Sequence, residues 1–185
     1  GRSMERSAGT PARQGLYDPC FEHEACGIGF VVHIKGERSN DILRQGLSLL
    51  INLDHRGASG SEVNTGDGAG IMMQVPHRFL KHACDGLGIP LPEPGRYGVG
   101  TVFLPPDRAL RRRCQRVFEE TVEAEGQRVL GWRSVPTDNL YLGSIAKAGQ
   151  PFIRQVFIGP SPDVEDEGAF ERKLYVIRRR ATHSI

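Results

Sequence analysis

The sequence predicts a single α+β domain in which helices and strands are mixed. Its 185 residues suffice for one sizeable hydrophobic core, since domains usually run to about 100–200 residues. Short apolar runs rich in β-branched residues alternate with segments whose apolar residues recur at helical spacing. Apolar residues make up 38% of the chain and charged residues 25%, as in ordinary globular proteins. No internal repeat interrupts this pattern.

The N-terminal quarter of the chain predicts a leader, a strand and a helix. Residues 1–25 are rich in Arg, Ser, Pro and Gly without any strand or helix period, which indicates a flexible leader. The run GIGFVVHI at 27–34 is continuously apolar, as in a strand buried on both faces. Leucine and isoleucine then recur at helical spacing, with Ser39 or Asn40 as the N-cap and Gly57 shortly after the end.

The remaining elements are predicted from the same two patterns, short apolar runs for strands and helical spacing of apolar residues for helices. Further strands are expected at 69–75, 97–105, 127–135 and 151–159. Further helices are expected at 76–88, from Asp107 to a stop at Gly126, and over 166–185. Pro76 suits the first turn of its helix, because a proline there loses no helical hydrogen bond.

Charge and cysteine content narrow the classes of partner. A formal net charge of +2 is too small to indicate nucleic acid or an acidic membrane surface. The basic stretch RRRCQR is followed closely by EETVEAE, as on a solvated helix. Four cysteines are too few for a disulfide scaffold in a chain of this size, and no apolar run reaches the ~18 residues of a membrane span. We therefore expect a cytoplasmic protein with no nucleic-acid or membrane partner.

Cys26, at the start of the first predicted strand, is a candidate nucleophile. If Cys26 became residue 1, its own α-amine could accept the thiol proton. Gly27 and Gly29 allow close backbone approach, and the short side chain of Ala25 leaves the Ala25–Cys26 bond open to attack by the thiol. The alternative is an inert core thiol, since free cysteine is among the most often buried residue types.

Two glycine-containing segments follow. In LDHRGASG, Arg56 either aims its guanidinium at the nucleophile or a carboxylate, or is a solvated cation at a helix C-terminus. NTGDGAGI, at 64–71, lacks the lysine of a phosphate-binding loop and leads into a predicted strand. We interpret it as a turn in which Asp67 is a turn former.

A zinc site is a further alternative. Cys20, His23 and Cys26 form C-x-x-H-x-x-C, and His82 and Cys84 are possible additional ligands. No second C-x-x-C supplies the missing ligand, so the set is incomplete.

Three motifs, in this order, carry a family resemblance. GLYDPCFEHEACGIGFVV, RQGLSLLINLDHRGA and TGDGAGIMMQVPHRF resemble the start of the large (alpha) chains of glutamate synthases. That region is a class II glutamine amidotransferase domain of the N-terminal-nucleophile type. The similarity extends from about residue 15 to about residue 180.

The resemblance implies a fold and a set of site residues. The implied fold is the four-layer αββα sandwich of N-terminal-nucleophile hydrolases, incomplete in this chain. The resemblance also implies that residues 1–25 are a propeptide and that 26–185 are the first part of the amidotransferase domain. Cleavage between Ala25 and Cys26 leaves Cys26 as the nucleophile with its α-amine as the base, and Arg56 supports its geometry.

The implied function is hydrolysis of L-glutamine, with the ammonia used to form glutamate from 2-oxoglutarate in nitrogen assimilation. The complete enzyme uses FMN and an iron–sulfur cluster, and we expect neither cofactor nor a metal in this chain. The implied partners are the remainder of the large chain and a small subunit. The electron donor, NADPH, NADH or ferredoxin, stays open.

The chain departs from the family pattern in two places. The His-Gln-Arg-Phe segment that binds the glutamine carboxylate and the Asn-Gly oxyanion pair do not occur in residues 1–185. Since one oxyanion donor is typically worth ~10²–10³ in rate, we expect weak or no activity from this fragment alone. Missing strands leave open edges, so we expect marginal stability or association. The alternatives are a module that binds a metal or partner through an unprocessed leader, and an inert product of a broken gene.

Overall fold

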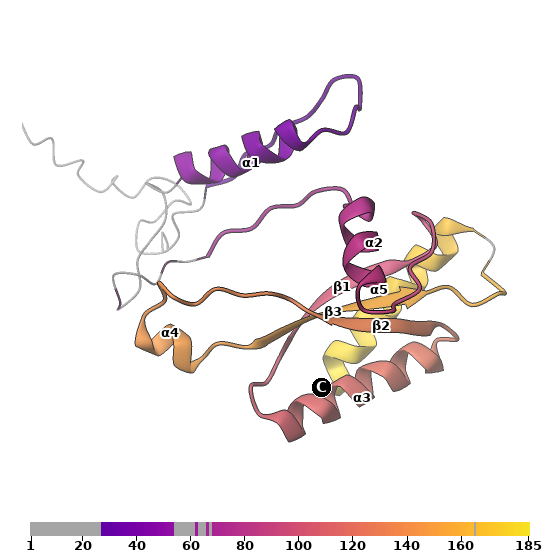
Figure 1. Cartoon of the computed structure of the whole chain (residues 1–185). Helices are drawn as coiled ribbons and strands as arrows, with labels where there is room; N and C mark the ends of the chain where they lie inside the picture. The colour runs from indigo at the N-terminus through magenta and orange to yellow at the C-terminus, as the bar shows by residue number, and fades with distance from the viewer. Residues whose placement is uncertain (1–26, 54–61, 63–65, 67, 165) are drawn as a thin grey trace, which may run out of the picture. The chain divides into compact units, whose positions relative to one another are not determined.

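The computed structural model describes residues 27–53, 62, 66, 68–164 and 166–185 (Figure 1). The chain divides into two compact units, Gly1–Ile71 and Met72–Ile185.

One helix, α1 (Asn40–Asn52), dominates the described part of the first unit. Ser39 is its N-cap, and the Ser39 hydroxyl accepts a hydrogen bond from the backbone N–H of Ile42 at 3.4 Å. Leu53 is the C-cap. The predicted helix and the first of its two proposed caps are confirmed, because a short polar side chain there satisfies an N–H that the helix leaves unpaired.

The predicted strand at 27–34 is wrong. These residues are irregular and end in a turn, and Ile28 is 97% and Phe30 85% exposed. The predicted strand at 69–75 is also irregular, with Met72 99% exposed. An apolar composition sets which side chains seek burial, but a strand also needs a neighbour to pair its backbone groups. Among the described residues, no strand pairs with either segment.

The second unit is built on an antiparallel sheet of three strands, β1 (Gly98–Leu104), β2 (Arg128–Ser134) and β3 (Phe152–Gly159). Their order is β1-β3-β2, so β3 is central and pairs with both others. The β2–β3 register shifts between Val129 and Gly131. All three strands confirm the predictions to within two residues.

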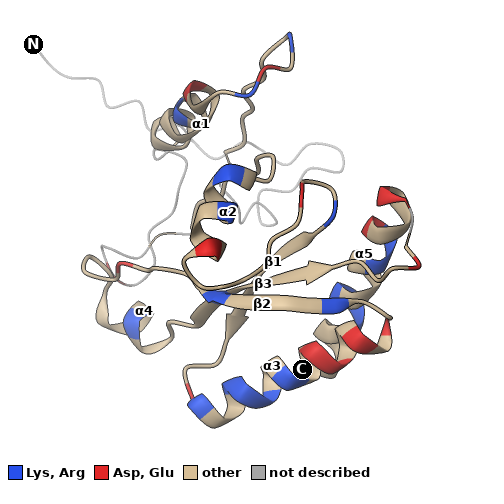
Figure 2. Cartoon of the chain, turned by 45° about the vertical axis from the view of Figure 1, so that its right-hand side comes forward, with Lys and Arg blue, Asp and Glu red and all other residues tan. Residues whose placement is uncertain are grey.

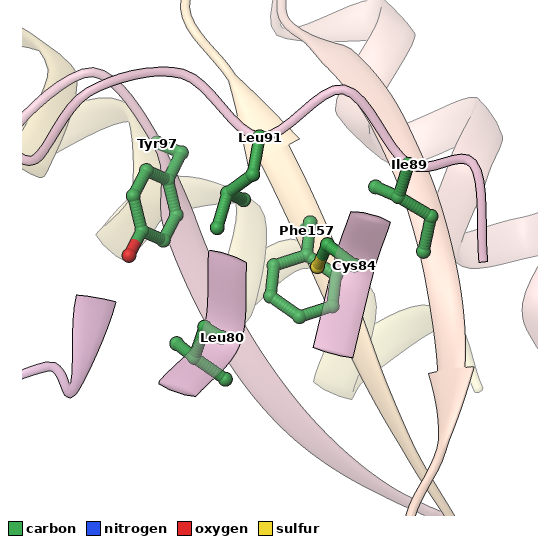
Figure 3. Close-up of a cluster of buried hydrophobic side chains, with 6 residues drawn as sticks. All are labelled: Leu80, Cys84, Ile89, Leu91, Tyr97 and Phe157. Carbon is green, nitrogen blue, oxygen red and sulfur yellow. The ribbon is translucent and has the colours of Figure 1, made fainter. Parts of the chain in front are cut away.

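Helices cover both faces of this sheet (Figures 1 and 2). On one face α3 (Arg108–Ala124) and α5 (Glu167–Ser184) enclose a core with the sheet. The buried members of this core are Val122, Val156, Ile158, Phe170 and Ile177. On the other face lies α2 (His77–Asp85), and its core, drawn in Figure 3, comprises Leu80, Cys84, Ile89, Leu91, Tyr97 and Phe157. Adjacent residues of β3, Val156 and Phe157, therefore serve opposite cores, as strand geometry requires.

Side-chain caps fix the ends of the two long helices. The carboxylate of Asp107 accepts from the N–H of Leu110 at 2.7 Å, and that of Asp166 from the N–H of Ala169 at 2.7 Å. Gly126, with φ +74°, follows α3 where the sequence predicted a stop. A short helix between β2 and β3, α4 (Ser144–Ala148), was not predicted.

The four-layer sandwich is not seen within the described residues. They form a single sheet with helices on both faces, whereas the expected fold stacks two sheets. None of the helices in the described ranges combines the length and apolarity that a membrane crossing requires.

Candidate functional site

The residues predicted to carry the chemistry lie outside the described residues. These are Ala25, Cys26 and Arg56, together with Asp67 and the N-terminal ligands Cys20 and His23. Their described neighbours along the chain are Gly27, Leu53 and Gly68. The structure therefore describes the segments that flank the predicted site residues, and not those residues themselves.

Two glycines hold the segment after Cys26 against α1. A Cβ atom on Gly27 would lie 2.9 Å from Cδ2 of Leu53, and one on Gly29 would lie 2.5 Å from Cδ1 of Leu49. Real Cβ contacts are longer, so only glycine permits this approach without displacing a leucine. Figure 1 shows the segment that begins at residue 27 running beside α1. The glycines of the first motif thus pack on the helix that carries the second.

The third motif meets the same helix. A Cβ atom on Gly46, within α1, would lie 3.1 Å from Cδ1 of Ile71. Glycine inside a helix costs roughly 1 kcal/mol relative to alanine, and close packing of Ile71 gives a reason for its presence. Gly68 lies within the predicted turn at 64–71 and has a φ of +92°, a backbone conformation that favours glycine. All three motifs therefore have residues in or against α1.

The two cysteines that the structure describes are core thiols. Cys84 is fully buried and Cys114 is 6% exposed, and both are free. Burial raises the pKa of the Cys84 thiol, an effect partly opposed by the nearby Arg133. Figure 3 shows its sulfur among apolar side chains. A thiol that is neither exposed nor ionised is a poor nucleophile, so Cys84 fits the structural role.

The described residues do not complete a zinc site. Cys84 is buried in the α2 core, whereas His82 on the same helix is exposed. Side chains two positions apart on a helix do not face each other, so these two cannot share an ion. Within the described ranges there is no group of three or more His, Cys, Asp or Glu side chains that could hold a metal. These residues therefore do not fit an iron–sulfur cluster either.

Comparison with known proteins places the chain in a family. The family model described as glutamine amidotransferases class-II matches residues 26–185. The chain therefore belongs to the class II glutamine amidotransferases.

The relatives are glutamate synthases. The chain is 50% identical over 171 residues to the glutamate synthase (NADPH) large chain of Bacillus subtilis, covering 92% of this chain and 11% of the relative. It is 41% identical over 180 residues to glutamate synthase (NADH) of Schizosaccharomyces pombe, covering 95% of this chain and 8% of the relative. It is 37% identical over 158 residues to ferredoxin-dependent glutamate synthase 2 of Synechocystis, covering 85% of this chain and 10% of the relative. The resemblance predicted from the three motifs is confirmed, and the chain spans about a tenth of these relatives.

Proposed function

We propose that this chain supplies the glutamine-hydrolysing part of a glutamate synthase, with Cys26 as the nucleophile once residues 1–25 are removed. The observation that carries the proposal is the extent of the family match, which begins at Cys26. The packing of Gly27 against Leu53 supports it, because Cys26 directly precedes Gly27 and Arg56 comes three residues after Leu53.

The bonds that form and break involve the new N-terminus, the substrate amide and a water molecule. The free α-amine of Cys26 accepts the thiol proton, and the sulfur attacks the side-chain amide carbon of glutamine. The C–N bond then breaks, and the nitrogen leaves as ammonia after taking a proton. The resulting thioester is hydrolysed by water, which releases glutamate and restores the thiol. An unprocessed leader removes the base, since the nitrogen of Cys26 is then an amide.

Arg56 is proposed to support the geometry of the nucleophile. A guanidinium offers planar, paired donors, which can fix a carboxylate or carbonyl oxygen in one orientation. Placement just after α1 suits a cation, because helix C-termini carry partial negative charge. The complete domain is proposed to be the four-layer sandwich of N-terminal-nucleophile hydrolases.

The wider reaction involves parts beyond this chain. We propose that the ammonia is added to 2-oxoglutarate by the remainder of the large chain, with FMN, an iron–sulfur cluster and a small subunit. The names of the relatives include NADPH, NADH and ferredoxin, so the electron donor is not assigned. A cytoplasmic location is proposed from the cysteine content.

Covalent labelling tests the nucleophile without requiring full turnover. A glutamine analogue with an electrophilic carbon in place of the amide should add one adduct to the purified chain, detected by intact mass. The adduct should persist in Cys20→Ala and be absent from Cys26→Ala, with circular dichroism confirming that both variants fold. Equal labelling of Cys26→Ala would overturn the assignment.

A further inference from the structure

The outer face of α3 carries a charged row in which the bases come first and the acids second. The row consists of Arg113, Arg116, Glu120 and Glu123, whose intervals along the chain place them on one face of the helix. All four side chains are exposed, and the residues that α3 buries in the core lie on its opposite face. Figure 2 shows the two kinds of charge separated along α3.

The charged row is not neutralised from within the part of the chain that the structure describes, where none of its members forms an ion pair. Arg116 and Glu120 are about one turn apart, but a base that precedes an acid by four positions is the weaker orientation of such a pair. The order also opposes the helix dipole, which favours bases in the last turn, where Glu123 lies. The stability of the helix therefore does not account for this order of charges.

The order of charges makes the row complementary to a second copy of itself. The spacing between the two arginines equals that between the two glutamates, so the row read backwards has the same spacing and the opposite charges. Two α3 helices that lie antiparallel about a two-fold axis between Arg116 and Glu120 bring Arg116 opposite Glu120 of the second copy. The same axis brings Arg113 opposite Glu123 of the second copy, and it repeats both pairs.

We propose that the charged row is an interaction surface whose partner is α3 of a second copy of this chain, held antiparallel by these reciprocal ion pairs. A parallel arrangement in register would put like charges together, so the charges select the antiparallel one. A nucleic acid fits less well, because the two glutamates of the row would repel phosphates. The proposal does not rest on the function assigned to Cys26.

The strength of the interaction follows from its chemistry. Exposed ion pairs contribute little singly and are screened by salt, so the dimer is weak and reversible. Sedimentation velocity of the full chain over a range of concentrations measures its dissociation constant. We expect a dimer in ~10 mM salt, where charges act over ~30 Å, and about tenfold or greater weakening in ~1 M salt, where they act over ~3 Å.

Two charge-reversal variants test the pairing itself. Arg113→Glu with Arg116→Glu makes the row wholly acidic, and Glu120→Arg with Glu123→Arg makes it wholly basic. Neither variant should dimerise alone in low salt, because like charges then face each other. An equimolar mixture of the two should form a one-to-one dimer. Circular dichroism checks that each variant keeps its helices.

A matched control separates the row from an effect of net charge. Arg38→Glu with Arg78→Glu changes the net charge as the acidic variant does, at two exposed positions outside α3, and should dimerise like the parent. A parent chain that stays monomeric in low salt would overturn the proposal. So would a dimer that survives high salt or forms in each reversal variant alone, and so would a mixture that stays monomeric.

Discussion

Gly27 lies so close to Leu53 that a Cβ atom on the glycine would be 2.9 Å from Cδ2 of the leucine. The contact joins the residue after the proposed nucleophile to the C-cap of the helix that precedes Arg56. A similar contact two residues further on links Gly29 to Leu49. These two contacts hold the segment that follows Cys26 against the helix that precedes Arg56.

Gly29→Ala should strain the contact between the segment that follows Cys26 and α1. The new Cβ would lie 2.5 and 2.6 Å from the two methyl carbons of Leu49 and 3.0 Å from its Cγ, so the whole leucine side chain must move. Overpacking of this kind typically costs about 1–3 kcal/mol, which urea unfolding would measure. Adding Leu49→Ala should recover part of the loss. Equal losses with and without the second substitution would contradict the contact.

Glu125 should make the second unit sensitive to acid. Hydrogen bonds from Arg180 and then from Lys173, the latter at 3.1 Å, lower the pKa of this carboxyl below its usual 4.5. The folded state therefore binds this proton less readily than the unfolded chain does. The resulting stabilisation is present above about pH 4.5 and is lost as the pH falls through the lower, folded pKa.

The position of Glu125 explains why it needs both cations. As the C-cap of α3 it lies at the negative end of the helix dipole. Figure 2 shows basic residues on the N-terminal half of α3 and acidic residues on the other half, the reverse of what the dipole favours. Glu125→Gln should cost about 1–2 kcal/mol at pH 7 and little at pH 3. The exposed Glu123→Gln is the control, and an equal loss in both variants at pH 7 would contradict the account.

Cys84 should not react with thiol reagents in the folded protein. It is fully buried and burial raises its pKa, so both access and ionisation are reduced. The test uses a colourimetric disulfide reagent at pH 7.5, about one unit below the usual pKa of a thiol. Peptide mapping should show that the reagent modifies Cys84 only after urea is added. Cys84→Ser should cost about 1–3 kcal/mol, because a hydroxyl replaces an apolar sulfur in this core. Rapid modification of the folded chain at Cys84 would refute the structural role.

The sheet of the second unit should promote association. Both β1 and β2 are edge strands, since no further strand among the described residues pairs with them. Phe103 on β1 is 67% exposed. Unpaired strand edges are templates for other chains, so the melting temperature should change over a hundredfold range of protein concentration. A sharp melt of a monomer at one temperature throughout would count against this.

The sequence allowed the second unit to be predicted much better than the first. Asp107 and Gly126 mark the ends of α3 by local chemistry, and Val156 and Phe157 alternate between two cores within a single strand. The runs at 27–34 and 69–75 have strand composition, but composition does not provide a pairing partner. The five-residue α4 is too short to show a helical period.

The residues of the candidate site were predicted from the sequence and not from the structure. Cys26 and Arg56 were predicted from short motifs and a family resemblance, and they stay predictions because they lie outside the described residues.

The central claim, that Cys26 becomes the N-terminal nucleophile, is tested most directly by the intact mass of the chain after expression in cells. The account predicts a mass that lacks residues 1–25 for the parent sequence and a full-length mass for Cys26→Ala. A parent chain that keeps residues 1–25, above all with stoichiometric zinc, would contradict the account and favour a binding module. Normal processing of Cys26→Ala would contradict it equally.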